Sequence, residues 1–256
     1  MKLRLLALLA TGLCTTAFLR AESYSFKEPF DRSAPFNSTG EISLENVNGS
    51  VEIRTWDKNE IRIEGEKNAK TEEELKLIDL TIDTAPDRVG IKVRLPKRSG
   101  GWFWGSNIRA AVRFTLTVPA TATLRKINTV NSRVVIDGVR GEVNASTVNG
   151  SIEATRLGAD ARLQTVNGGL TVSFDALVPT QRISLETVNG GITVKLPKNA
   201  GVSVDASVVN GGVSCDFPIT LSGGGVHRHS LHGAIGGGGA SLHASSVNGG
   251  IHLREL

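Results

Sequence analysis

The chain is poor in cysteine, and this shortage limits how it can be stabilised. Only Cys14 and Cys215 occur among its 256 residues. Cys14 lies in a segment with the features of a signal peptide, so the exported chain would keep a single thiol. An internal disulfide framework is therefore excluded, and stability must come from packing. Because Cys215 falls at an inward position of the repeat described below, we expect a small buried apolar residue there.

The sequence also lacks a long apolar segment. Its first residues carry Lys2 and Arg4, then an apolar run over residues 5–13, then small residues up to Ala21. This order is typical of a signal peptide, and the run is shorter than the roughly 20 residues that cross a bilayer. We assign residues 1–21 to a signal peptide. The mature chain is then exported, to the periplasm or the cell surface, and has no transmembrane segment.

A charge excess of either sign is missing as well. Lysine and arginine number 29 against 25 aspartates and glutamates, but Lys2, Arg4 and Arg20 belong to the signal segment. The mature chain therefore has 26 basic residues against 25 acidic ones. Nucleic-acid binding needs a concentrated basic face, so we expect no nucleic-acid partner.

Catalytic signatures are absent too. The sequence has no serine nucleophile elbow, P-loop, dinucleotide-binding glycine pattern, paired cysteines or HExxH motif. Four aspartates, Asp160, Asp175, Asp205 and Asp216, stand at different offsets from the repeat asparagines and need not converge on one face. We expect neither an enzyme nor a cofactor. A polysaccharide-active enzyme is the alternative, and it would require clustered carboxylates.

What the sequence does contain is a repeat of Val-Asn followed by Gly or Ser. The repeated asparagines are Asn48, Asn131, Asn149, Asn167, Asn189, Asn210 and Asn248. After Asn131 the steps are 18, 18, 22, 21 and 38 residues, and we interpret the last as two steps with a degenerate turn between them. A period of about 20 residues is typical of a solenoid.

Apolar and polar residues alternate on both sides of each asparagine. In the Asn149 repeat, Val143 and Ala145 precede the asparagine and Ile152 and Ala154 follow it. This period of two is that of strands with one buried face. The sequence therefore predicts an all-β fold in which strand, VNG turn and strand stack into a parallel β-solenoid, or β-helix. Asn and Gly suit such turns, so we favour a structural role for the asparagines over a row of amides that binds sugar or calcium.

The N-terminal half has a different sequence pattern. Residues 40–56 fit the repeat, and residues 59–119 contain alternating segments bounded by turn residues, typical of an antiparallel β-meander. Residues 70–77 predict a short helix. We divide the mature chain into an N-terminal β region over residues 22–123 and solenoid repeats over residues 124–256.

These features together resemble a known family. A signal peptide, the segment NVNGSVEIRTWDKNEIRIEGEK, a strand ending in TVP and serial TVNGG turns are similar to the bacterial putative-adhesin family of β-strand-repeat proteins, a domain of unknown function. The resemblance covers residues 40–256. It implies an exported protein with a β-helix-like fold and no assigned activity, and it offers no catalytic residues to carry over.

An aromatic cluster lies in a segment that predicts a long hairpin loop. Trp102, Phe103 and Trp104 follow Lys97, Arg98 and two glycines. Indole rings stack on sugars and sit at membrane interfaces, and the cations would favour an acidic glycan or anionic headgroups. The alternative is that these rings fold back and pack against the solenoid.

All five histidines fall near the C-terminus. His227, His229 and His232 lie in or beside glycine-rich sequence, while His243 and His252 occupy outward repeat positions. Clustered imidazoles can bind zinc or copper, but no acid or thiol stands beside the first three in the sequence. We favour a solvated loop over a metal site.

The sequence thus favours a module that presents a surface, binding a glycan or an envelope protein, over a catalyst. The rival hypothesis is a structural or regulatory component of the cell envelope that contacts no glycan. A solenoid with a poorly capped end can also associate end to end with a second copy.

Overall fold

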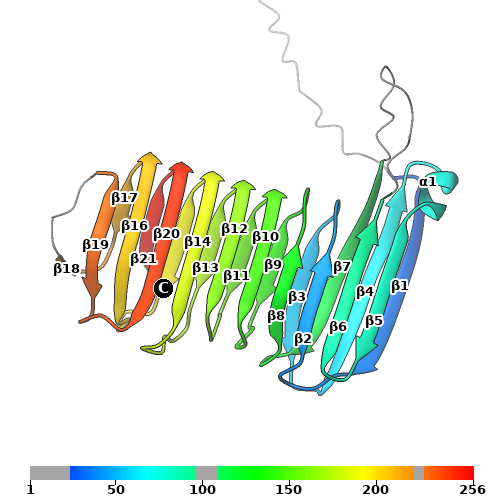
Figure 1. Ribbon diagram of the computed structural model, residues 1–256, viewed down its shortest axis with the longest axis horizontal. Helices are drawn as coiled ribbons and strands as arrows, with labels where there is room; N and C mark the ends of the chain where they lie inside the picture. Colours follow the sequence, from blue (N-terminus) through cyan, green and yellow to red (C-terminus); the bar gives the residue numbers. More distant parts are fainter. Residues whose placement is uncertain (1–23, 96–108, 222–227) are drawn as a thin grey trace, which may run out of the picture.

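The computed structural model describes residues 24–95, 109–221 and 228–256, and over these ranges the chain is all-β with one short helix (Figure 1). Its strands form two large sheets, neither of which closes into a barrel. The sheets face each other across one apolar core, and each contains both parallel and antiparallel pairs. No helix within the described ranges has the length and apolar character needed to cross a membrane.

We call the two sheets sheet A and sheet B, and different strands form the edges of each. Among the described residues, sheet A has the strand order β1 (Phe26–Pro35), β4 (Glu60–Ala69), β7 (Ala110–Pro119), β3 (Val51–Trp56), β9 (Val134–Asp137), β11 (Ile152–Thr155), β13 (Leu170–Ser173), β15 (Ile192–Leu196), β21 (Ile251–Glu255) and β17 (Val213–Cys215). Sheet B has the order β18 (Ile219–Leu221), β19 (Ser230–Ile235), β16 (Val202–Asn210), β20 (Ala240–Asn248), β14 (Arg182–Asn189), β12 (Ala161–Asn167), β10 (Val143–Asn149), β8 (Thr123–Asn128), β2 (Glu41–Glu45), β6 (Arg88–Arg94) and β5 (Asp79–Ala85).

Most of the stack consists of equivalent units, each made of a sheet B strand, a Val-Asn turn and a sheet A strand. We name each unit by its asparagine. The units are Asn48 (β2, β3), Asn131 (β8, β9), Asn149 (β10, β11), Asn167 (β12, β13), Asn189 (β14, β15), Asn210 (β16, β17) and Asn248 (β20, β21). Neighbouring units pair in parallel with equivalent residues opposite each other, as in Asn149 with Asn167 and Asn167 with Asn189.

The alternation predicted from the sequence places the core between the sheets. In β10, Val143 and Ala145 are buried while Asn144 and Ser146 face outward. Ile152 and Ala154 of β11 fill the same layer from sheet A. Parallel pairing in register repeats this layer from unit to unit, so one continuous apolar core runs along the stack.

The spatial order of the units differs from their order in the sequence. The Asn248 unit lies between the Asn189 and Asn210 units, although it follows both along the chain. The 38-residue step is therefore not two stacked repeats. It contains β18 and β19, which pair antiparallel with each other, and β19 also pairs antiparallel with β16 at the outer side of the Asn210 unit.

The N-terminal region is not the meander that we expected. β6 pairs in parallel with β2, and β7 pairs in parallel with β3. The antiparallel pairs are β5–β6 in sheet B and β4–β7 in sheet A, so these strands do not form one continuous antiparallel sheet. The chain switches sheets after β4, through α1 (Glu72–Lys76), which begins after the N-cap Thr71 and falls within the predicted residues 70–77. β1 then pairs antiparallel with β4 and carries prolines and charges at the sheet edge, where they discourage pairing with another chain.

Candidate functional site: the turn edge and the β6 groove

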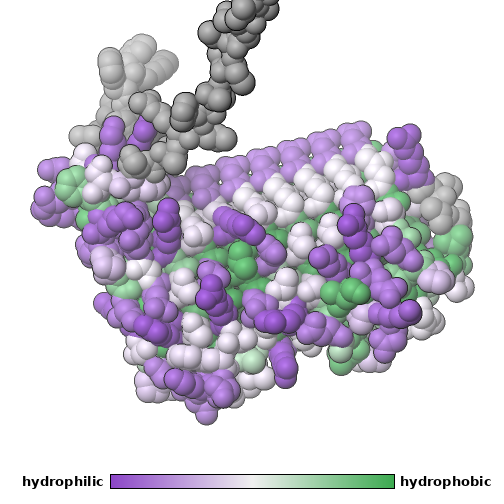
Figure 2. Space-filling view, turned by 180° about the vertical axis from the view of Figure 1, so that it is seen from behind, coloured by the Kyte–Doolittle hydropathy of each residue, from purple (hydrophilic) through white to green (hydrophobic). Residues whose placement is uncertain are grey.

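The seven turn asparagines form one hydrogen-bonded row along an edge of the molecule, which we call the turn edge. Each Nδ2 donates to the Oδ1 of the asparagine in the next unit at 2.7–2.9 Å, from Asn210 through Asn248, Asn189, Asn167, Asn149 and Asn131 to Asn48. The row ends where Asn48 Nδ2 donates to the Ala110 carbonyl at 2.9 Å. Figure 2 shows it as a continuous hydrophilic line along the upper edge. All bonds run in one direction, so the side-chain dipoles add.

A second set of contacts fastens each turn to its neighbour from inside. Two residues before the asparagine, the hydroxyls of Thr165, Thr187 and Ser246 donate to the glycine carbonyl of the preceding turn at 2.9–3.0 Å. The turns approach so closely that a Cβ on Gly168 would stand 2.0 Å from the Gly150 carbonyl oxygen. A side chain on Gly168 would clash at that spacing, and glycine follows the asparagine in every unit except Asn131, where Ser132 stands.

Valines border the asparagine row on the sheet B side. In six units this valine is 37–66% exposed. A row of exposed apolar residues is unusual, because exposed positions are mostly polar. These valines are Val130, Val148, Val166, Val188, Val209 and Val247. The turn edge therefore presents two uncharged rows side by side, one of exposed valines and one of asparagine amides.

A groove with charged and hydroxyl side chains lies beyond the Asn48 unit, on the outer face of sheet B along β6. Gly90 forms its floor, because a side chain at this position would meet no atom within 4 Å. We call this hollow the β6 groove. It is lined by Arg88, Gly90, Lys92 and Arg94 of β6, by Glu41, Ser43 and Glu45 of β2, and by Thr81 and Asp83 of β5.

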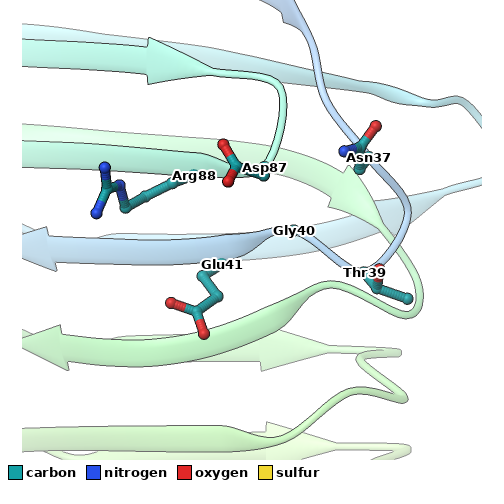
Figure 3. A pocket seen from close by; sticks show the side chains of 6 residues that line it. All are labelled: Asn37, Thr39, Gly40, Glu41, Asp87 and Arg88. Atoms are coloured by element: carbon teal, nitrogen blue, oxygen red, sulfur yellow. The ribbon is translucent and has the colours of Figure 1, made fainter.

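The groove extends to the edge opposite the turns. There a hollow of about 420 Å³ is lined by Asn37, Thr39, Glu41, Asp87 and Arg88 around Gly40 (Figure 3). Further along β6, hollows of about 300 and 370 Å³ share Gly90 and Asp83 in their linings. Cations, carboxylates, hydroxyls and an amide are all within reach of a ligand, which favours a polar ligand with many hydrogen-bonding groups.

Glu45 is the most strongly paired acid of the groove. Lys126 Nζ lies 2.6 Å from one carboxylate oxygen and Lys92 Nζ lies 3.1 Å from the other. The hydrogen bonds from Lys126, then from Lys92, hold the pKa of Glu45 below its usual value. A lowered carboxyl pKa in the folded state adds stability at neutral pH, and this stability is lost as the pH falls through the folded pKa.

We therefore predict that Glu45→Gln destabilises the protein more at pH 7 than at pH 3. The cost at pH 7 should stay below about 1 kcal/mol, because the pair is partly exposed and solvent screens it. Urea unfolding midpoints of wild type and variant at both pH values measure the difference. Equal midpoint differences at pH 7 and pH 3 would show that the lysines do not stabilise the ionised carboxylate.

The residues predicted to contact a ligand lie outside the described ranges. Lys97, Arg98, Trp102, Phe103 and Trp104 belong to residues 96–108, and the structure describes only the flanking Leu95 and Arg109. These flanks follow β6 and precede β7, whose neighbours β2 and β3 are joined by the Asn48 turn. Leu95 directly follows Arg94, which lines the β6 groove.

The structure brings two of the described histidines, His232 and His243, to one aspartate. His227 lies outside the described residues, His229 lies in a turn, and His232 belongs to β19, not to a solvated loop. Asp205 sits between His232 and His243, whose Nδ1 atoms lie 2.9 and 3.0 Å from its two oxygens. Across residues 24–95, 109–221 and 228–256, no three histidine, cysteine, aspartate or glutamate side chains gather in a way that could hold a metal ion.

Cys215 is half-buried against the core instead of fully enclosed. Burial raises the pKa of its thiol, so the protonated form is favoured. The weaker burial follows from its place in β17, which lies at the edge of sheet A.

Sequence reasoning missed the β6 groove. Its one local signal is Gly90 within the apolar alternation of RVGIKV, because a glycine inside a strand often marks a close approach or a gap. The groove also needs the parallel pairing of β6 with β2, which joins segments about 45 residues apart and which alternation cannot predict.

Comparison with known proteins gives a likeness of fold. No family model matches the chain, and no curated protein is similar to it in sequence. A putative cell adhesion protein from Clostridium sporogenes has a similar structure, with a TM-score of 0.51 and 14% identity over 90% of this chain and 100% of that one. The chain thus shares its all-β architecture with that protein.

Two more solved structures match less well. A putative adhesin from Bacteroides fragilis has a TM-score of 0.32 and 9% identity over 88% of this chain and 97% of its own. A putative lipid binding protein from Parabacteroides distasonis has a TM-score of 0.33 and 12% identity over 89% and 96%.

Proposed function

We propose that this chain is an exported, non-catalytic binding module of the cell envelope, built as a β-solenoid with VNG turns. The observation that carries the proposal is the β6 groove, an open hollow lined by charged and hydroxyl side chains on strands β2, β6 and β5, which pair with one another along their length. Fixed geometry suits binding, because the scaffold needs no ordering when a ligand arrives.

The ligand class follows from the lining. Arg88 and Lys92 supply donors, Asp83 and Glu41 supply acceptors, and Ser43 and Thr81 supply hydroxyls. A glycan offers many hydroxyls that can donate and accept at once, so it can use both sets. The fold shared with a putative cell adhesion protein supports a binding role, and the paired state of Glu45 with Lys92 and Lys126 favours recognition over acid–base chemistry.

We predict that residues 22–256 bind members of a panel of bacterial and host glycans, and that Gly90→Phe abolishes this binding. A Cβ at Gly90 would meet no atom within 4 Å, so the backbone accepts a side chain there, and the phenylalanine ring would take up space in the groove; aromatic residues are well suited to strands. The affinity should fall by about tenfold or more, which corresponds to about 1.4 kcal/mol. Gly90→Ala is the matched control and should keep most of the affinity.

A second variant tests the prediction made from the sequence. Trp102→Ala with Trp104→Ala removes two indoles and leaves the groove intact. If this variant loses glycan or anionic-liposome binding while Gly90→Phe keeps it, the ligand contacts the aromatic segment and not the groove. If the wild type binds nothing, the structural or regulatory envelope role replaces the binding role, and turnover of any glycan would contradict the non-catalytic proposal.

A further inference from the structure

The Asn248 unit occupies a slot between two units that precede it in the sequence. β20 pairs in parallel with β14 on one side and β16 on the other, and β21 pairs likewise with β15 and β17. Leu242 of β20 and Ile251 and Leu253 of β21 point into the core and are 0–1% exposed. Residues 240–256 are therefore an inserted element held from both sides.

The two units that flank this slot are in register with each other. Asn248 stands opposite both Asn189 and Asn210, and Leu242 stands opposite both Ile183 and Val204. Without the inserted element, the Asn210 unit could move by one strand spacing, about 4.8 Å, and pair directly with the Asn189 unit. Core-facing residues of the Asn210 unit would then stand opposite core-facing residues of the Asn189 unit, as Val204 opposite Ile183.

The connection between the flanking units permits this closure. Five residues, 197–201, join β15 to β16 across the slot. Five residues, 156–160, also join β11 to β12, and those two strands belong to adjacent units with no slot between them. Five residues thus connect adjacent units as well as units that are separated by the slot. Residues 197–201 would therefore also be long enough to connect the Asn189 and Asn210 units if these two paired directly.

The link that leads into the inserted element is a run of four glycines. Gly236, Gly237, Gly238 and Gly239 join β19 to β20, and all four have positive φ, from +58° to +144°. Glycine adopts such angles freely and adopts extended ones as readily, so this turn can open without steric cost. Short hinges of this kind are where identical elements exchange between protomers.

We propose that residues 240–256 are an exchangeable element, and that the partner is a second copy of this chain whose slot they fill. The exchanged element would make the same contacts with β14, β16, β15 and β17 of the second copy as it makes in its own. The exchange adds no new interface chemistry and depends on protein concentration. It requires transient exposure of Leu242, Ile251 and Leu253, so it should be slow.

Cysteines placed across the slot test the exchange. Ser184 of β14 stands directly opposite His243 of β20 on the outer face, and equally opposite Arg162 of β12 on its other side. In a Cys215→Ser background, Ser184→Cys and His243→Cys are made in separate chains, mixed at high concentration, and oxidised. A disulfide between chains can form in the stack only when one chain's element lies in the other chain's slot.

The matched control mixes Ser184→Cys with Arg162→Cys, since β12 and β14 are not part of the exchangeable element. We expect the 184/243 mixture to give about tenfold more disulfide-linked dimer than the 184/162 mixture. The double variant Ser184→Cys with His243→Cys in one chain shows independently that the pair can be oxidised. Dimer yields that match the control at all concentrations, including after partial unfolding and refolding, would overturn the proposal.

A hinge variant gives a second readout. Gly237→Pro cannot keep φ at +82°, so the compact turn is excluded and the open link is favoured. We expect this variant to shift from monomer toward dimer in size-exclusion chromatography with light scattering. A folded, monomeric Gly237→Pro protein would count against exchange through this hinge, and if the variant does not fold the cysteine experiment decides alone.

Discussion

Replacing Gly168 with alanine should lower the free energy of unfolding by about 3 kcal/mol. The added Cβ would lie 2.0 Å from the Gly150 carbonyl oxygen and 2.5 Å from its carbon. Both atoms belong to the backbone of the adjacent turn, so neither can rotate away. The two units must separate locally, and this strains the asparagine bond between Asn167 and Asn149 and the hydroxyl bond from Thr165. Urea unfolding measures the loss as a lower midpoint.

The neighbouring glycine provides the control for this prediction. A Cβ on Gly169 would lie 3.3 Å from the Gly191 carbonyl oxygen, and the equivalent residue in the Asn149 unit is already a serine, Ser151. Gly169→Ala should therefore cost less than about 1 kcal/mol. If both variants unfold at the wild-type midpoint, the turns are not stacked in solution as closely as described.

Replacing Asn46 with alanine should also cost about 3 kcal/mol. This side chain is 3% exposed, and its Nδ2 donates to the carbonyls of Asn48, Gly49 and Val112 at 3.2, 3.2 and 2.9 Å. Its Oδ1 accepts from the Val47 N–H. Alanine would leave buried polar groups without these partners and would remove one of the bonds that link the Asn48 turn to β7, where the Asn48 amide and two backbone bonds would remain.

Thr165→Ala is the comparison, because Thr165 occupies the same position in its own unit and makes a single hydroxyl bond, to the Gly150 carbonyl. Its loss should cost about 1 kcal/mol. Thermal or urea unfolding of both variants gives the ratio. Equal costs would mean that the Asn46 amide contributes no more than an ordinary turn hydroxyl.

Local patterns predicted the repeated region of the fold, because there each residue's role is set by its own unit. Alternation placed Leu163, Leu185 and Val204 inward, and all three are buried. The shared turn placed the asparagines at equivalent positions, and they pair with one another. Stacking identical units requires no knowledge of distant segments, so a period in the sequence becomes a period in space.

The ends of the stack could not be predicted in this way. The Asn189, Asn210 and Asn248 units present the same register to a neighbour, so alternation does not say whether the Asn189 unit pairs with Asn210 or with Asn248. The order is decided by β18 and β19, which cover the Asn210 unit and turn the chain back. At the other end, β6 pairs with β2 because the chain returns to sheet B after β4, a change of layer that has no marker beyond α1.

The candidate site depends on these less predictable ends. Gly90 becomes the floor of a groove only because Ser43 and Asp83, both small, lie beside it on neighbouring strands. The sequence shows that Gly90 interrupts an alternating strand, but it does not show which residues of other strands lie beside it. The aromatic prediction was local, since it depended on composition within one segment, and it stays a prediction because residues 96–108 lie outside the described ranges.

The interleaved order of the units has a consequence for how the protein is made. A polypeptide is synthesised from its N-terminus, so the Asn210 unit exists before the Asn248 unit that will separate it from Asn189. In that interval the incomplete chain can stack in simple sequential order, and this product buries its core and pairs its strands. If these two units join in that interval, residues 240–256 must separate them again before they can enter the slot. Maturation of the stack would therefore end with an intercalation, and the rate at which nascent chains reach the native order would be set by the reopening of an earlier contact.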